Sequence, residues 1–367
     1  MTTTYRYLLA DLLTNEIIAE LPLIGVAFTQ QLNQAGTLSA HLLLSGVNSA
    51  AFNVDNSTIP GRNVIYADRD GVLVWGGIIW GRSYNSGDQT LSIQCRELIS
   101  YFERRRITQT VEFTGIDQLV IAKTLIENAQ DAPYGDIGLL YNSEGETTSG
   151  VLVDRVYYDY ELKTVFNAIQ DLSRQEDGFD FHVDIYYQDG LPVRAFNTYY
   201  PRVGTAYDVD DAGALVFQFP AGNIVEYEYP EDGSIAANTV YALGAGSNEG
   251  KLISVAQDAV KLGEGWPLLE EQANYLDVTD TTVLDNLAIG RVNALSYPPT
   301  TIKIVVPPYI DPVYGTYEVG DDARIIIQDN RFPDGFDQVY RIVGISVQPG
   351  EDGPERATLT MAIGTGA

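Results

Sequence analysis

The stretch from 62 to 95 constrains the fold more than any other part of the chain, because it predicts three consecutive antiparallel strands. The strands cover 62–67, 72–80 and 90–95, with polar and glycine-containing turns between them. Two sets of side chains alternate in the third strand, one apolar and one polar: Leu91, Ile93 and Cys95 against Thr90, Ser92 and Gln94. This period of two is typical of a half-buried antiparallel strand.

A looser copy of this three-strand pattern lies near the C-terminus, at 323–328, 339–347 and 357–363. Gly77 and Gly344 each fall in the middle of the second strand, where a glycine marks a bulge or a close backbone approach. The repeated pattern predicts two units that share one β fold.

Four regions follow from the change of pattern along the chain. Residues 1–104 contain only strand-like segments, and they predict a barrel or sandwich because an open sheet of so many short strands would leave costly edges. Residues 105–225 predict an α+β unit. Segments 226–250 and 298–367 predict the second β unit, and 251–297 predict an inserted helical or extended segment.

Helices are predicted from apolar side chains at the helical period behind a capping residue. In the α+β unit, Asp117 caps a helix over 118–130, and Asp159 caps a second one whose apolar stripe begins at Leu162. In the inserted segment, Pro267 starts a short helix to 273, and Asp280 caps a longer one.

The charge of the chain argues against a surface that grips DNA or RNA. The sequence has 22 basic and 50 acidic residues, for a net charge of −28, whereas nucleic-acid binding needs clustered Lys and Arg. The single cysteine, Cys95, is interpreted as a core residue. The N-terminal residues lack the pattern of a signal peptide, and no apolar run approaches the thickness of a bilayer, so we expect synthesis in a cytoplasm.

Two clusters of charged side chains are candidate sites. Asp180, His182 and Asp184 share one face of a predicted strand, but alternation alone places polar residues on the solvent face, so we interpret them as solvated and not as a metal site. Arg104, Arg105 and Arg106 are interpreted as charges that pair with carboxylates at a domain junction, not as a phosphate site. No recognised catalytic motif is present, although two-carboxylate glycosidase chemistry requires none and stays open.

The order of these units resembles the baseplate-hub or minor tail proteins of long-tailed bacteriophages. The resemblance is carried by Gly76-Gly77-Ile78-Ile79-Trp80 through Arg106, and by Val319-Gly320-Asp321 through Ile363. It implies a mainly β chain with α+β insertions, in which two tube-type β-barrel domains let three subunits make a ring of six similar units.

The resemblance also implies a function. The chain would form a homotrimeric hub ring at the tail tip of the virion, adapting the six-fold tail tube to three-fold tip parts. Its neighbours would be the distal tail ring, the tape-measure protein and other tail-tip proteins, and genome DNA would pass through without specific binding. We expect no enzymatic activity, no cofactor and no direct membrane insertion.

The residues expected to face that channel come from the polar faces of the two third strands: Thr90, Ser92, Gln94, Thr358 and Thr360. Their apolar neighbours would be costly to leave against water. An alternative from another class stays open, a tail-tip cell-wall hydrolase or glycan-binding protein, suggested by the many aromatic and acidic residues.

Overall fold

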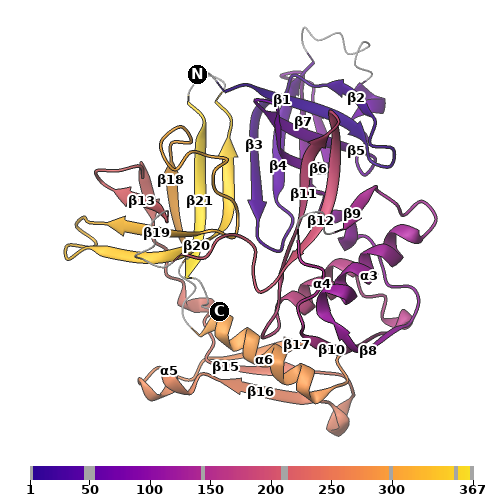
Figure 1. Ribbon diagram of the computed structural model, residues 1–367, viewed down its shortest axis with the longest axis vertical. Helices are drawn as coiled ribbons and strands as arrows, with labels where there is room; N and C mark the ends of the chain where they lie inside the picture. The colour runs from indigo at the N-terminus through magenta and orange to yellow at the C-terminus, as the bar shows by residue number, and fades with distance from the viewer. Residues whose placement is uncertain are drawn as a thin grey trace.

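The computed structural model describes residues 3–44, 54–141, 145–207, 214–296, 301–350 and 354–363. Two β units lie side by side, an α+β unit packs against the first of them, and a smaller sheet with its own helices lies below (Figure 1). The predicted fold class, mainly β with α+β elements, is confirmed.

The first β unit contains seven strands, a short helix and a 3-10 helix: β1 (Tyr5–Asp11), β2 (Ile17–Glu20), β3 (Ile24–Gln31), β4 (Thr37–Leu43), α2 (Val54–Ser57), β5 (Asn63–Arg69), β6 (Val72–Asn85), β7 (Thr90–Glu97) and η1 (Leu98–Glu103). Strands β5, β6 and β7 are antiparallel neighbours. They are the meander that the alternation in the sequence predicts.

The second β unit contains six strands: β13 (Leu215–Phe219), β14 (Glu226–Glu228), β18 (Thr301–Val306), β19 (Asp322–Ile327), β20 (Phe336–Gln348) and β21 (Arg356–Ile363). Strands β19, β20 and β21 form the second antiparallel meander. Of the turn expected at 350–353, residues 351–353 lie outside the described residues.

The two β units share one strand order. The first runs β3-β4-β7-β6-β5-β1, and the second runs β14-β18-β21-β20-β19-β13. The last pair differs, because β1 is antiparallel to β5 whereas β13 is parallel to β19. The pairing of the second and third meander strands shifts by one residue between Ile79 and Gly81, and again between Ile342 and Gly344. Alignment on these shifts makes Gly81 the counterpart of Gly344, instead of Gly77 as the sequence pattern suggested.

A ladder between β20 and β3 joins the units into one continuous sheet. Gly344 lies opposite Gln31, and Val347 lies opposite Phe28. The whole sheet has 13 strands. Eight of them, in the order β14-β18-β21-β20-β3-β4-β7-β6, cross from one unit to the other and are called the eight-stranded sheet below.

One apolar cluster lies under this sheet and contains side chains from both units, among them Phe28, Ile93, Val347 and Leu359. Strand β5 is buried on both faces. Ile65 contributes to the shared cluster, and Tyr66 belongs to a second cluster with the helices of the α+β unit. Because both faces are buried, nearly all side chains from 64 to 67 are apolar.

The α+β unit comprises β8 (Val111–Asp117), α3 (Gln118–Asp131), β9 (Leu139–Tyr141), β10 (Leu152–Tyr157), η2 (Asp159–Glu161), α4 (Val165–Ser173), β11 (Asp180–Gln188) and β12 (Leu191–Tyr199). Asp117 caps α3 as predicted, accepting the Leu119 N–H at 2.9 Å. The predicted start of α4 is wrong. Thr164 caps it instead of Asp159, because Leu162 has a left-handed backbone (φ 48°) that interrupts the helix.

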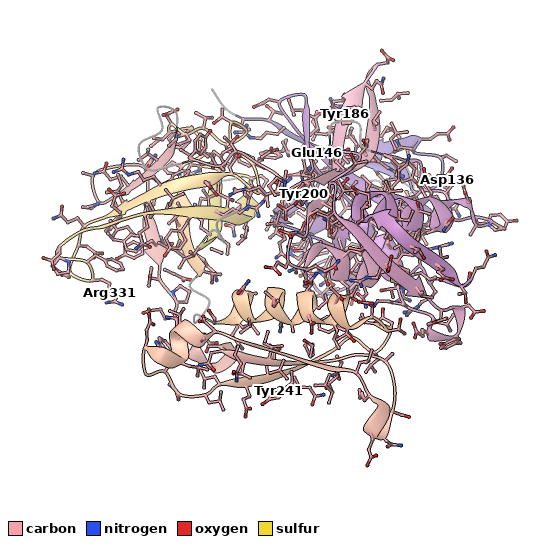
Figure 2. The ribbon with its side chains drawn as sticks, turned by 60° about the horizontal axis from the view of Figure 1, so that its bottom comes forward. Asp136, Glu146, Tyr186, Tyr200, Tyr241 and Arg331 are labelled. Atoms are coloured by element: carbon pink, nitrogen blue, oxygen red, sulfur yellow. The ribbon has the colours of Figure 1, made fainter. Side chains whose placement is uncertain are left out.

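The lower unit comprises η3 (Gly233–Ile235), β15 (Thr239–Leu243), η4 (Asn248–Gly250), β16 (Ile253–Gln257), α5 (Ala259–Gly263), β17 (Glu270–Asn274) and α6 (Thr281–Leu295). Helix α6 covers one face of its three-stranded sheet, and Figure 2 shows Tyr241 on the opposite face. Asp280 caps α6 as predicted.

Three sequence-based assignments around this unit differ from the structure. Strand β15 was expected in the second β unit, but it pairs with β16 and β17. Strand β13 was expected in the α+β unit, but it pairs with β19. The segment after Pro267 becomes strand β17 and not a helix, because it pairs in parallel with β15, a long-range contact that local periodicity does not reveal. The division of the chain into domains otherwise stays a prediction.

Candidate functional site

The polar face of the eight-stranded sheet crosses both β units. Thr358 lies opposite Ser346 on one side and Val305 on the other, and Ser346 in turn lies opposite Thr29. In the first unit Ser39 lies opposite Gln94. These side chains alternate with core residues along their strands, so they point away from the shared apolar cluster.

The chemistry of this face is mostly hydroxyl, amide and small apolar. Lys303 lies 3.8 Å from a carboxylate oxygen of Glu228 across the β14–β18 pair. Arg96 pairs with Glu103 at 2.5 Å, and Arg356 is exposed at one end of β21. A face of this composition offers phosphate groups few free cations.

All five residues that were expected to face a channel lie on this surface. Thr90, Ser92 and Gln94 come from β7, and Thr358 and Thr360 come from β21. In the alignment of the two units, Ser92 corresponds to Thr358 and Gln94 to Thr360. That they line a channel stays a prediction.

Sequence reasoning missed the residues that connect the two halves of this face. Strand β4 alternates visibly, with Thr37, Ser39 and His41 exposed between buried neighbours, so its polar face could have been assigned. Ser346 could not have been joined to Thr29, because their proximity depends on the β20–β3 ladder between segments more than 300 residues apart.

Two of the three arginines after η1, Arg105 and Arg106, contact the α+β unit, but not in the expected way. Arg105 donates to the Ala129 carbonyl at 2.9 Å and lies over the Tyr101 ring, and Arg106 donates to the Leu162 carbonyl. The side chain of Arg104 is exposed. The expected carboxylate pairing is wrong for Arg105 and Arg106, whose contacts are carbonyl oxygens and an aromatic ring. The adjacent Glu103 is occupied by Arg96.

The interpretation of Asp180 as a solvated residue is also wrong. Its side chain is only 8% exposed, and it accepts hydrogen bonds from Asn33 at 2.8 Å, from the Val203 N–H at 3.0 Å and from Arg341. The start of β11 lies between Asn33 of the β3–β4 loop and Arg341 of the second β unit, so the face that alternation assigned to solvent is covered at Asp180. Asp180 therefore fastens the α+β unit to both β units.

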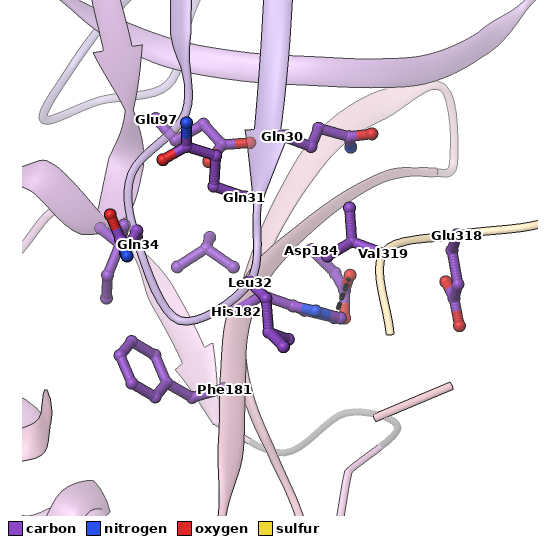
Figure 3. A pocket seen from close by; sticks show the side chains of 12 residues that line it. Gln30, Gln31, Leu32, Gln34, Glu97, Phe181, His182, Asp184, Glu318 and Val319 are labelled. Atoms are coloured by element: carbon purple, nitrogen blue, oxygen red, sulfur yellow. Dashed lines mark ion pairs between the residues drawn. The ribbon is translucent and has the colours of Figure 1, made fainter. Parts of the chain in front are cut away.

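His182 and Asp184 line a small cavity of about 80 Å³ together with Glu97 and Glu318 (Figure 3). His182 Nε2 lies 2.8 Å from Asp184, and Tyr199 donates to Asp184 at 3.2 Å. Burial lowers the pKa of His182, but the hydrogen bond and charge of Asp184 outweigh it and hold that pKa above its ordinary value. The same pair keeps the pKa of Asp184 low against the opposing effect of burial.

Glu97, another carboxylate of this cavity, has a pKa that moves strongly upward. Burial raises the pKa of Glu97 to about 8, although the Gly36 N–H donates to it at 2.6 Å and favours the charged form. The raised pKa values of Glu97 and His182 favour their protonated forms, whereas the lowered pKa of Asp184 favours its carboxylate. Among the described residues no three His, Cys, Asp or Glu side chains are placed to hold a metal ion.

Over the same described parts of the chain, no helix has the length and apolar character needed to cross a membrane. Comparison of the sequence with protein-family models gave no match, and comparison with curated proteins gave none.

Comparison of the structure did find similar proteins. A tail protein from Neisseria meningitidis superposes with a TM-score of 0.58 at 14% sequence identity, covering 97% of this chain and 96% of that one. The 43 kDa tail protein of prophage MuSo2 from Shewanella oneidensis gives 0.59 at 11% identity, with 98% of each chain covered. This chain has the tail-protein fold. Prophage tail protein gp18 from Listeria monocytogenes gives 0.54 at 11% identity, covering 97% of this chain and 94% of that one.

Because the matched regions span nearly the whole of all three tail proteins, the tail-protein fold includes the α+β units as well as the paired β units. The identities are too low to transfer any residue's role. The polar face of the shared sheet and the enclosed Asp180 are therefore described from this chain alone.

Proposed function

We propose that this protein is a structural component of a virion, located at the tail tip, where three copies form a hub ring around a channel. The observation that carries the proposal is the eight-stranded sheet with one polar face, built from two units of the same strand order. Three such chains supply six similar units, which matches a six-fold tube on one side and three-fold parts on the other. The tail-protein fold supports this assignment.

A channel for DNA must not bind the DNA that slides through it. Each phosphate contact with Lys or Arg adds affinity that does not depend on base sequence. The polar face carries Ser346, Thr358 and Thr29 at its centre, and its Lys303 lies beside Glu228. A wall of this kind lets DNA pass.

The partners proposed for the ring are the distal tail ring, the tape-measure protein and other tail-tip proteins. The fold supports a place among tail components, and the net charge of −28 supports a surface that repels the genome. We propose no catalytic role. The cavity beside His182 is about 80 Å³, too small for a sugar residue of a cell-wall polymer. A larger hollow of about 240 Å³ is lined by Glu112, Asp154, Asp277 and Asp280. Three of these carboxylates already accept hydrogen bonds within the chain, Asp154 from the Gly115 N–H, Asp277 from Lys163 and Asp280 from the Val283 N–H.

Light scattering after size exclusion tests the ring. The expected mass is that of three chains, and electron microscopy should show an axial channel lined by the face that carries Gln94 and Thr360. A ring lined instead by Arg104, Arg105 and Arg106, or a particle without an axial channel, contradicts the proposal. A zymogram on host cell wall tests the alternative, with no clearing expected.

A further inference from the structure

We propose that segment 226–232 of one chain adds as a strand to the open half of β6, residues 81–85, in a second copy of this chain. The inference rests on the proposed ring and specifies the junction between its subunits. Its basis is the β20–β3 ladder, which joins the two β units within one chain.

In that internal junction β20 serves two partners along one side. Its first half pairs with β19, from Phe336 to Arg341, and its second half pairs with β3, from Gly344 to Val347. Strand β21 pairs along its other side. The second half of β20 thus extends beyond β19, and this free half pairs with β3, the first strand of the other unit's sheet.

Strand β6 has the same form in the first unit, but its receiving half is open. Its first half pairs with β5 as far as Ile78, and β7 pairs along its other side. Within the described residues no strand pairs with the β5 side of 81–85. The alignment of the two units makes Gly81 to Tyr84 the counterparts of Gly344 to Val347, and Tyr84 is 53% exposed.

Strand β14 is the counterpart of β3 and forms the opposite end of the eight-stranded sheet. Glu228 lies opposite Lys303 as Ala27 lies opposite Ser39 in the first unit. Continuing this register makes Pro230 the counterpart of Thr29 and Glu231 the counterpart of Gln30. Open strand edges pair readily with a strand from another chain.

The proline in this segment does not oppose the pairing. Its counterpart, Thr29, directs its carbonyl away from β20: Trp75 Nε1 donates to it at 3.0 Å, and a Cβ on Gly36 would meet it at 1.9 Å. The N–H of a strand residue points to the same side as its C=O. The N–H that Pro230 lacks would therefore point toward its own sheet and not toward the second copy.

The charges of the two edges are complementary. In the proposed register Arg82 lies opposite Glu231 of the neighbouring copy, and Ser83 lies opposite Pro230. Glu231 is half exposed and is held by Arg331, which Figure 2 shows at the outer end of the second unit. The acidic edge also carries Glu226 and Asp232. On the receiving edge Arg62 is largely exposed beside Asp11. Arg82 donates to the Val54 carbonyl and to Thr58 of its own chain, and a quarter of its side chain stays exposed.

The first test is a cross-link in the full chain carrying Ser83→Cys and Pro230→Cys, since the native Cys95 is buried. Oxidation should give covalent dimers and then trimers on a non-reducing gel. Mixing the two single variants should give dimers only. The matched control, Ser83→Cys with Glu249→Cys, moves the second thiol to an exposed position in the lower unit and should stay monomeric on the gel.

The second test is a charge exchange. Arg82→Glu and Glu231→Arg should each lower the trimer fraction by at least tenfold, and the double variant should restore it. The control Glu249→Arg makes the same change of charge away from the edge and should leave the trimer intact. Thermal melts of each variant separate lost association from lost folding.

The proposed junction and the proposed ring can fail separately in these tests. A wild-type trimer without the 83–230 cross-link, or a double variant no better than the single ones, overturns the junction and leaves the ring. A wild-type protein that stays monomeric at every concentration overturns both.

Discussion

In the first β unit, β5 is buried on both faces, whereas the outer face of its counterpart β19 in the second unit is buried at Asp322 and only partly covered at Arg324 and Ile326. The register places Val64 and Tyr66 where the second unit has Asp322 and Arg324. Tyr66 is fully buried under the α+β unit, while Arg324 is partly exposed and pairs with Asp337. The strand order and the inner apolar face are common to both units. The outer face differs: it carries Tyr66 where the α+β unit covers it, and Arg324 where it is partly exposed.

The largest effect is expected from Asp180→Ala, which removes one of the ion pairs between the α+β unit and the second β unit, while the pair of Arg202 with Asp322 remains. The change leaves the largely buried Arg341 without its carboxylate, and removing one partner of a buried pair costs about 3–5 kcal/mol. The free energy of unfolding from denaturant titration measures it.

The matched control for Asp180→Ala is Asp337→Ala, which breaks the more exposed pair with Arg324 on the open face of the second unit. We expect a loss of about 1 kcal/mol or less there. Equal losses of stability for the two variants would show that the buried Asp180–Arg341 pair contributes no more than the exposed Asp337–Arg324 pair.

The next prediction compares Gly77 and Gly344, the two glycines that the sequence pattern aligned. A Cβ on Gly77 would meet the Arg96 carbonyl oxygen and the Trp75 ring at 2.4 Å, so Gly77→Ala should cost about 3 kcal/mol. A Cβ on Gly344 would meet nothing closer than 3.4 Å, so Gly344→Ala should change stability by about 0.5 kcal/mol or less. Thermal melts of both variants measure the two losses, and similar losses would show that the two glycines do not differ in how closely they are packed.

A smaller effect is expected from Tyr66→Phe. The Tyr66 hydroxyl accepts a hydrogen bond from Nε of the fully buried Arg194 at 2.6 Å and donates to Asn15 at 2.6 Å. Without the hydroxyl, the buried Arg194 Nε–H has no acceptor at this position, and the loss costs about 2 kcal/mol in the free energy of unfolding. Arg324→Gln, at the counterpart position, should cost about 0.5 kcal/mol. A Tyr66→Phe variant as stable as wild type would show that the Arg194 network does not depend on this hydroxyl.

The last prediction concerns pH. Glu97 has a pKa of about 8 in the folded protein against an ordinary value of 4.5, so between these values the folded state holds a proton that the unfolded state has lost. The free energy of unfolding should therefore fall as pH rises from about 4.5 to 8. His182, with its raised pKa, adds a fall of the same sign as pH rises.

Glu97→Gln should flatten this fall, and unfolding measured across the pH range gives the slope. The counterpart of Glu97 in the second unit is Ile363, which does not titrate, so the effect belongs to the first unit alone. An unchanged slope in the variant would exclude Glu97 as its source.

The sequence by itself determined the two meanders, their inner and outer faces and the helices that begin at Asp117 and Asp280. These features depend on alternation and on capping, which act between residues close in the chain. The resemblance stated from the sequence agreed with the tail-protein fold. Alternation also placed Thr90, Ser92 and Thr358 on the polar faces of their strands.

Only the tertiary structure decided which strands meet across the chain. The β20–β3 ladder, the enclosure of Asp180 and the parallel pairing of β17 each join segments separated by long stretches of sequence. A strand's alternation shows that one face is apolar, but it does not show what will cover the other face. That is why Asp180 was assigned to solvent, and why the open half of β6 became visible only when its counterpart in β20 was seen paired with β3.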